Sequence, residues 1–433
     1  MSDSGPGLTV RRFLATLGPG ILFAATSIGA SHLVLAPRAG MLYGAELLWL
    51  VILAHALKYP AFDLGPRYAM AAGESLLAGY ARLPGRWPLW CFVVFTVLQG
   101  IGVAVAVTSV TASVLAVSFG DWPPGLDALH LTPLSFWGIV VSTASVGLIL
   151  VGRNRGMEIL NNFMMAALLV LTVVVFAVKP TPASYLVHLV VPALPAGSLV
   201  LAAAVLGWMP TGIDVSIWHS MWALEKKGRW ASLGKGPDRL GLMRSAMLDM
   251  RVGYALSIVT GVIFYLLGTH IKLEGTAPDG ARVAAAISTV YVDALGSWAF
   301  PLFMAAAFFA MFSTTYIVMD GFPRSLAESL RLLVPSRRSS SGLWSAPYIA
   351  LLVVVWVSVI PILVLVPKPV FIVKSAALLS FLVAPLYYGL NVFCASRFIP
   401  PGPLRPSRAW TAICWTGAAL MAVSSLIFIV SEL

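Results

Sequence analysis

Long apolar runs follow one another along almost the whole chain, separated by short polar segments. Most runs have about 20 residues or more, the length that an α-helix needs to cross a hydrocarbon core of about 30 Å. The apolar positions are continuous and do not alternate with a period of two, so they favour helices over a membrane barrel. The pattern predicts an all-α integral membrane protein with about eleven transmembrane helices, at 12–42 (interrupted), 45–72, 88–118, 134–152, 157–178, 197–223 (interrupted), 249–270, 298–327, 346–366, 370–396 and 409–430.

The composition supports one membrane domain over residues 1–433. Apolar residues make up 59% of the chain and charged residues 10%, whereas about a quarter of the residues in soluble domains are charged. The longest connections, at 224–248 and 328–345, are too short for a soluble domain. We find no nucleophile–base pair and no metal-ligand cluster with a recognisable spacing, so we expect neither an enzyme nor a bound cofactor.

The distribution of basic residues predicts the orientation in the membrane. The net charge of +11 resides largely in alternate loops, which is the positive-inside pattern and does not indicate a nucleic-acid partner. We therefore expect a multi-pass protein of the plasma (inner) membrane with a cytoplasmic N-terminus and an outer C-terminus; the oligomeric state stays open. The loops assigned to the outer side carry only Lys179, Lys272, Arg282 and Lys368.

Two of the expected helices contain glycine and proline near their middles. The first has Gly-Pro-Gly at 18–20 and SIGAS at 27–31, and the sixth has GWMPTG at 207–212. Interrupted helices at matching places in two halves are typical of transporters with inverted repeats, whose unwound backbone faces a substrate at the membrane midplane. We predict repeats at about 12–178 and 197–396, with an extra helix at 409–430. The alternative is that these residues only mark kinks.

Several motifs resemble the NRAMP-type divalent metal transporters. The segment from Gly18 to Val51 aligns without gaps with their first helix and the start of the second, and the alignment runs on to Gly73. This resemblance covers most of the chain at modest identity and implies the LeuT-type fold of the APC superfamily, with five plus five inverted helices plus one, broken helices 1 and 6, and alternating access. The other matching motifs are Arg155 with Glu158, Met209-Pro210, and the run from Val318 to Phe322.

The departures from that family concern the ion site. In its metal carriers the first helix breaks at Asp-Pro-Gly-Asn, whose Asp and Asn supply oxygens to the metal. Here these positions are Gly29, Ala30, Ser31 and His32, so the carboxylate is absent. The family's Met-Pro-His in helix six becomes Met209-Pro210-Thr211, and the span at 97–117 lacks acidic residues. His32 with Met209 would make a minimal soft-metal pair.

A positive charge near the break favours an anion instead. Arg38 follows His32 by six residues, and its guanidinium suits a planar oxyanion. The alternatives are that Arg38 pairs with an acid such as Glu46 or reaches the outer surface. From the lost carboxylate, His32 and Arg38, we expect a small inorganic oxyanion, with bicarbonate as the leading example. The residues expected at its site are Ser27, Gly29, Ala30, Ser31, His32, Arg38, Met209, Pro210, Thr211 and Gly212.

Coupling to Na⁺ or H⁺ is assigned to three other residues. Asp214 is an acid inside a membrane span, which is costly and therefore a functional candidate, although it is equally suited to a structural ion pair. Ser313 and Thr314 lie on helix eight, which by analogy contributes to a Na⁺ site, although hydroxyls more often bond their own helix. The sequence thus predicts a secondary transporter of a small ion, not a typical Mn²⁺ or Fe²⁺ carrier. The alternatives are a metal transporter with a rearranged site and a non-transporting membrane sensor.

Overall fold

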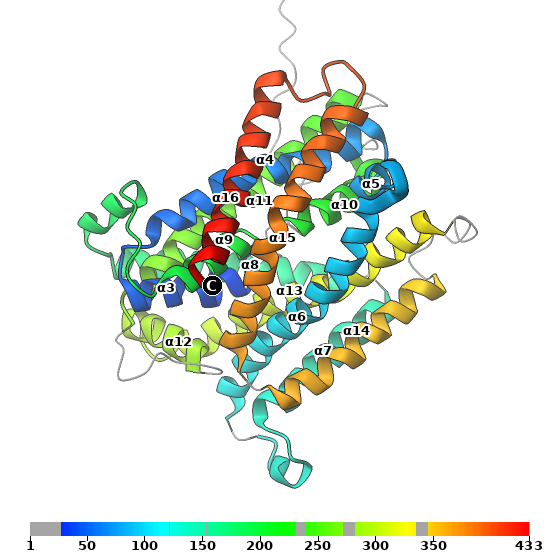
Figure 1. The fold of residues 1–433 in the computed structure, drawn as a ribbon. Helices are drawn as coiled ribbons and strands as arrows, with labels where there is room; N and C mark the ends of the chain where they lie inside the picture. Colours follow the sequence, from blue (N-terminus) through cyan, green and yellow to red (C-terminus); the bar gives the residue numbers. More distant parts are fainter. Residues whose placement is uncertain are drawn as a thin grey trace, which may run out of the picture.

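The computed structural model describes residues 27–120, 122–152, 155–230, 239–271, 282–334, 345–366 and 368–432. Within these residues the regular structure is entirely helical (Figure 1). Seven of the helices are long and apolar enough to cross a membrane by length and composition. The spans after the first break and through the sixth helix are η1 Ser31–Leu35, α3 Ala36–Tyr43, α9 Leu199–Trp208 and α10 Asp214–Trp230. The unbroken spans are α4 Leu48–Ala72, α6 Trp87–Phe119, α7 Pro133–Val151, α8 Arg155–Val178, α11 Arg239–Gly268, α13 Ala299–Leu333, α14 Ala346–Leu365, α15 Pro369–Phe398 and α16 Arg408–Glu432.

Each expected span corresponds to a helix or a pair of half-helices, the first only from Ser27 onward, since 12–26 lie outside the described residues. Three boundaries were wrong: α11 begins at Arg239, about ten residues before the expected start, and α10 and α13 end at Trp230 and Leu333, about seven and six residues beyond their expected ends. The structure adds two helices that the apolar pattern did not predict, α5 Leu76–Ala81 and α12 Arg282–Leu295. Short 3₁₀ segments occur at Pro84–Arg86, Leu126–Leu129 and Ala183–Leu189.

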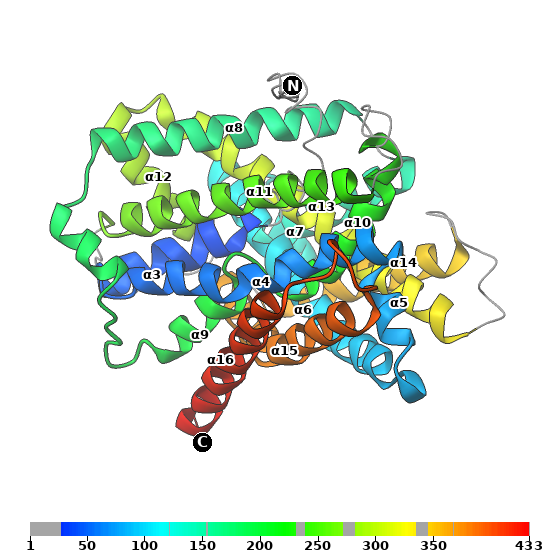
Figure 2. The same cartoon turned by 90° about the horizontal axis from the view of Figure 1, so that it is seen from above.

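The broken helices lie at the centre of the bundle. Helix α6 packs against both α13 and α15, and α15 packs against half-helix α9. Helix α4 covers α10, and α11 covers α3. Helices α7 and α14 form an outer pair, and α16 lies outside α15 and α4 (Figures 1 and 2). The two interrupted spans that the sequence predicts are therefore observed, each packed against continuous helices.

Glycines allow the half-helices to approach their neighbours closely. A Cβ built on Gly40 of α3 would lie 2.1 Å from the Tyr265 carbonyl oxygen of α11, and one on Gly207 of α9 would lie 2.1 Å from the Ala377 carbonyl oxygen of α15. Close backbone approach at small residues is the usual way in which membrane helices gain packing energy, because lipid is as apolar as the side chains. These contacts fix the half-helices against the shell.

Two arginines connect the ends of neighbouring helices. Arg86 donates to the carbonyl oxygens of Leu332 and Leu333 at the end of α13, and Arg324 of α13 pairs with Glu225 of α10 at 2.5 Å. The ends of α6, α10 and α13 thus meet on one side, as the alternation of charged loops requires. That this side faces the cytoplasm stays a prediction.

Candidate functional site

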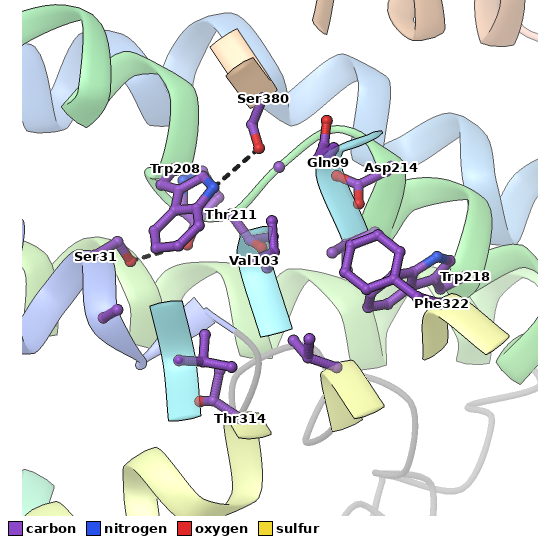
Figure 3. A pocket seen from close by; sticks show the side chains of 16 residues that line it. Ser31, Gln99, Val103, Trp208, Thr211, Asp214, Trp218, Thr314, Phe322 and Ser380 are labelled. Atoms are coloured by element: carbon purple, nitrogen blue, oxygen red, sulfur yellow. Dashed lines mark hydrogen bonds between the residues drawn. The ribbon is translucent and has the colours of Figure 1, made fainter. Parts of the chain in front are cut away.

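Both helix breaks are observed where the glycine and proline residues stand. The first helix bends at Ile28 and Gly29 before η1, and the sixth is unwound between α9 and α10. Pro210 lacks an N–H, so the backbone bonding of α9 ends with Met209, whose N–H donates to the Val205 carbonyl at 2.8 Å. The Ser31 hydroxyl lies 3.4 Å from the Pro210 carbonyl oxygen and joins the two breaks (Figure 3).

A cavity of about 40 Å³ lies between the two breaks and helices α6, α13 and α15. A single water needs roughly 10–15 Å³ by this measure, so the space suits a small ion with a few waters and excludes an organic solute. The cavity is lined by Ala30, Ser31, Gln99, Val103, Val107, Trp208, Pro210, Thr211, Gly212, Asp214, Val215, Trp218, Thr314, Val318, Phe322 and Ser380.

Asp214 is the only ionisable residue among the described residues that line this cavity. It begins α10 and is 5% exposed, and the Gln99 side chain of α6 hydrogen-bonds to its carboxylate. Because a carboxylate only accepts, the Gln99 amide nitrogen must be the donor. This leaves Gln99 Oε1 buried without a partner in the described part of the chain. The Gln99 and Asp214 side chains thus lie next to each other on the lining of the cavity (Figure 3).

Lys58 of α4 holds the break in helix six from the opposite side. Its ammonium is fully buried and donates to the Gly207 carbonyl at 2.7 Å and to the Thr211 carbonyl at 3.0 Å. Gly207 belongs to the last turn of α9, whose free carbonyls carry the negative end of the helix dipole. Lys58 also interacts electrostatically with Asp214. The Asp214 charge is thus already partly balanced, which weakens the attraction for any cation. Asp63, on the same helix as Lys58, pairs with Arg67 at 2.7 Å.

The structure brings about half of the expected site residues to the cavity. Those that line it are Ala30, Ser31, Pro210, Thr211, Gly212, Asp214 and Thr314. Those that do not line it are Ser27, Gly29, His32, Arg38, Met209 and Ser313. Ser313 and Thr314 both donate their hydroxyls to the Ala310 carbonyl of their own helix, at 2.9 and 3.1 Å, which is the commoner arrangement for helical hydroxyls.

The two residues that suggested an anion lie elsewhere. Arg38 is half-buried on α3, on the far side of η1 from the break. The His32 ring faces α11, where Nε2 lies 2.9 Å from the Ser257 carbonyl oxygen. Met209 also packs toward α11, with its Cε 3.3 Å from a Cβ built on Gly261. Neither the expected anion pair nor the alternative soft-metal pair therefore forms part of the cavity.

Sequence reasoning missed Gln99, Ser380 and the role of Lys58. A signal for Gln99 was present, because it is the only amide in the apolar span at 97–117. Nothing in the sequence distinguished Ser380 from the two other serines of α15. In the structure its Oγ accepts from the Trp208 indole at 3.0 Å.

Thr314 explains why position 29 is glycine. A Cβ on Gly29 would lie 2.8 Å from Thr314 Oγ1, closer than real Cβ atoms approach, and 3.0 Å from its Cγ2. We expect Gly29→Asp alone to destabilise the protein, and Gly29→Asp with Thr314→Ala to have room for the carboxylate. The double variant should bind Mn²⁺ at least about tenfold more tightly than the unchanged chain, since a carboxylate adds a strong attraction in a site of low dielectric. Calorimetric titration and thermal unfolding test this; if the single variant is as stable as the double one, Thr314 does not restrict the position.

The comparisons with known proteins agree with the geometry. Residues 20–431 match the model of the natural resistance-associated macrophage protein-like family, Nramp. An uncharacterized protein of Pasteurella multocida is 32% identical over 338 residues, which cover 75% of this chain and 72% of that protein. The divalent metal cation transporter MntH of Mycobacterium tuberculosis is 26% identical over 288 residues, 65% of this chain and 62% of that protein.

Solved structures share the fold. A mutant form of the Eremococcus coleocola manganese transporter superposes with a TM-score of 0.74 at 14% identity, covering 100% of this chain and 90% of that one. MhsT in complex with L-phenylalanine gives a TM-score of 0.60 at 14% identity, covering 97% and 98%. The helix order, the two breaks and these similarities agree: the chain is a membrane transporter with the LeuT-type fold and belongs to the Nramp family.

Proposed function

We propose that this protein transports a hard divalent cation, such as Mg²⁺ or Mn²⁺, by alternating access, with Asp214 and Gln99 as its protein ligands. The observation that supports this most directly is that Asp214 and Gln99, whose Oε1 has no partner in the described part of the chain, both line the cavity bounded by the two helix breaks. Carboxylate and amide oxygens suit Mg²⁺, Ca²⁺ and Mn²⁺. Mg²⁺ usually keeps several waters and takes one or two carboxylates, which agrees with a small cavity that holds one acid.

The small oxyanion expected from the sequence has less support. Its two cationic residues, His32 and Arg38, do not line the cavity, and the one ionisable side chain that does is acidic. The positive end of α10 already faces the Asp214 carboxylate, which accepts from the backbone N–H groups of Asp214 and Val215. An anion at this end of the helix would have to compete with that carboxylate.

Liposomes containing the purified protein would test the cargo. Internal dyes report Mg²⁺ entry, Mn²⁺ entry and bicarbonate-driven pH change, with protein-free liposomes as the control. We expect saturable uptake of Mg²⁺ and Mn²⁺, half-saturated on the order of 0.1–1 mM because few charged ligands are present. Bicarbonate flux without cation flux would establish the anion reading instead, and no flux of any of these would favour a sensor. Comparing uptake with and without Na⁺ and pH gradients tests the expected coupling.

Selectivity between hard and soft cations is a separate prediction. In a site where the Met209 thioether contributes no ligand, a soft ion such as Cd²⁺ has no advantage over Mn²⁺. We therefore expect Cd²⁺ to inhibit Mn²⁺ uptake no better than Mg²⁺ or unlabelled Mn²⁺ does, and Met209→Leu to leave this order unchanged. If Cd²⁺ inhibits at tenfold lower concentration and Met209→Leu removes the effect, sulfur does bind the cargo.

A further inference from the structure

A charged side chain binds the end of half-helix α9 from outside the cavity. Lys58 of α4 is 0% exposed, and its Nζ donates to the Gly207 carbonyl at 2.7 Å and to the Thr211 carbonyl at 3.0 Å. Gly207 belongs to the last turn of α9, and Thr211 belongs to the unwound segment that follows. Thr211 lines the cavity, whereas Lys58 does not. The ammonium thus holds both sides of the break without entering the space for the cargo.

The two carbonyl oxygens are of the kind that transporters with broken helices offer to a coupling cation. The C-terminal end of a half-helix carries negative partial charge, and together with unwound backbone carbonyls it coordinates Na⁺ in such proteins. Here both oxygens already accept from Lys58. An ammonium group has the same charge as Na⁺, but this one is covalently attached to α4, a continuous helix, and cannot leave with the cargo.

The charges around Lys58 agree with a permanent cation at this place. Asp214 interacts electrostatically with Lys58, and the two together contribute no net charge beside the cavity. Asp63, five residues further along α4, is paired with Arg67 at 2.7 Å. His55, one turn before Lys58, is another ionisable group that interacts with it electrostatically. A buried ammonium without compensation would be costly, so Asp214 and the two carbonyls provide the compensation.

We propose that Lys58 takes the place of a coupling cation at the break of helix six, so that the protein moves its cargo without coupling to Na⁺. The ammonium keeps the Gly207 and Thr211 carbonyls paired throughout the transport cycle. Lys58 is thus a positioning residue, which holds the break and does not touch the cargo. The consequence for transport rests on the proposed function, whereas the occupied site at the break does not.

Replacing the attached cation by a free one tests the site without any cargo. Lys58→Ala removes the ammonium and leaves space for a small cation beside the Gly207 and Thr211 carbonyls. Its melting temperature in detergent is compared in the chloride salts of Na⁺, methylammonium and choline at about 0.15 M, where screening is the same. We expect Na⁺ or methylammonium to raise it by roughly 3 °C or more over choline, which is too large for the space and has no N–H donor. The unchanged protein should melt at the same temperature in all three salts.

Two control variants separate the charge of the side chain from its shape. Lys58→Met fills the space without a charge, so it should be less stable than the unchanged protein and should not respond to the choice of cation. Lys374→Ala removes a half-buried lysine of α15 and should behave like the unchanged protein. Equal melting temperatures of Lys58→Ala in the three salts would overturn the proposal, because a lysine with only a structural role gives that result.

Transport by the unchanged protein gives a second test that does not require Lys58→Ala to fold. Uptake of Mg²⁺ or Mn²⁺ into liposomes should be the same with Na⁺ or choline outside, and no radioactive Na⁺ should enter with the cargo. Faster uptake under an inward Na⁺ gradient, or entry of Na⁺ that depends on the cargo, would overturn the inference. If neither Mg²⁺ nor Mn²⁺ enters, the proposed function fails, while the melting temperatures still decide on the site at Lys58.

Discussion

Asp214→Asn is expected to reduce cation uptake at least about 100-fold at low cation concentration while leaving the fold intact. Asparagine has nearly the same shape and its oxygen can still accept from Gln99, while the change removes the negative charge that faces both the cavity and Lys58. Two unit charges 4 Å apart at an effective dielectric constant of 20 attract by about 4 kcal/mol, and each 1.4 kcal/mol is a factor of ten. The attraction for a divalent ion is larger, and retained waters offset part of it. Initial uptake rates in liposomes at matched protein density measure the effect.

Asp293→Asn is the matched control for this variant. Asp293 lies on α12 with its side chain 64% exposed, and it pairs only loosely with Lys179 at 3.2 Å. An exposed pair of this kind contributes little, so uptake should equal that of the unchanged protein. Uptake by Asp214→Asn within threefold of that level would show that the carboxylate is not a cargo ligand and that Asp214 mainly balances Lys58 and the end of α10.

The long helices could be predicted from the sequence because the membrane requires about 20 apolar residues in each. The same criterion explains why the predicted start of α11 was too late. The first turns of this helix contain Arg239 and Arg244 and are not apolar, so the hydropathy pattern did not include them. Helix α12 was missed for the opposite reason: it is short and contains polar residues. Hydropathy identifies only segments that are apolar enough to lie in lipid. The start of α11 and helix α12 are less apolar than that, so the pattern could not predict them.

The breaks could be predicted, but the direction of individual side chains could not. Glycine widens the range of backbone conformations and proline removes an N–H donor, so the local effects of Gly29 and Pro210 can be predicted from the sequence. Whether Arg38 or His32 faces the cavity depends on the rotation of the helix about its axis. Each residue turns the helix by about 100°, so an error of one residue points a side chain to a different neighbour. Here η1 winds as a π-helix, which changes that rotation along Ser31–Leu35. His32 consequently meets Ser257 of α11, at a sequence separation of 225 residues that no local pattern reveals.

Gly207→Ala should destabilise the protein strongly and abolish transport. The new Cβ would lie 2.1 Å from the Ala377 carbonyl oxygen and 3.0 Å from Phe381 Cβ, and a backbone carbonyl in the middle of α15 has little freedom to move. Half-helix α9 must therefore shift, and the Gly207 carbonyl, which accepts from Lys58 at 2.7 Å, shifts with it. We expect a loss of about 3 kcal/mol, the upper part of the range for overpacked cores, and loss of uptake because the break itself is displaced.

Gly147→Ala provides the comparison that isolates this contact. Gly147 lies within α7, and a Cβ there would meet nothing within 4 Å. Alanine favours a helix over glycine by up to about 1 kcal/mol, so this variant should melt at the same temperature as the unchanged protein or higher. Thermal unfolding in detergent and uptake in liposomes are measured for both. Equal melting temperatures for the two variants would mean that α9 can separate from α15 freely. The close contact between the half-helix and its neighbour would then not be what holds the cavity in shape.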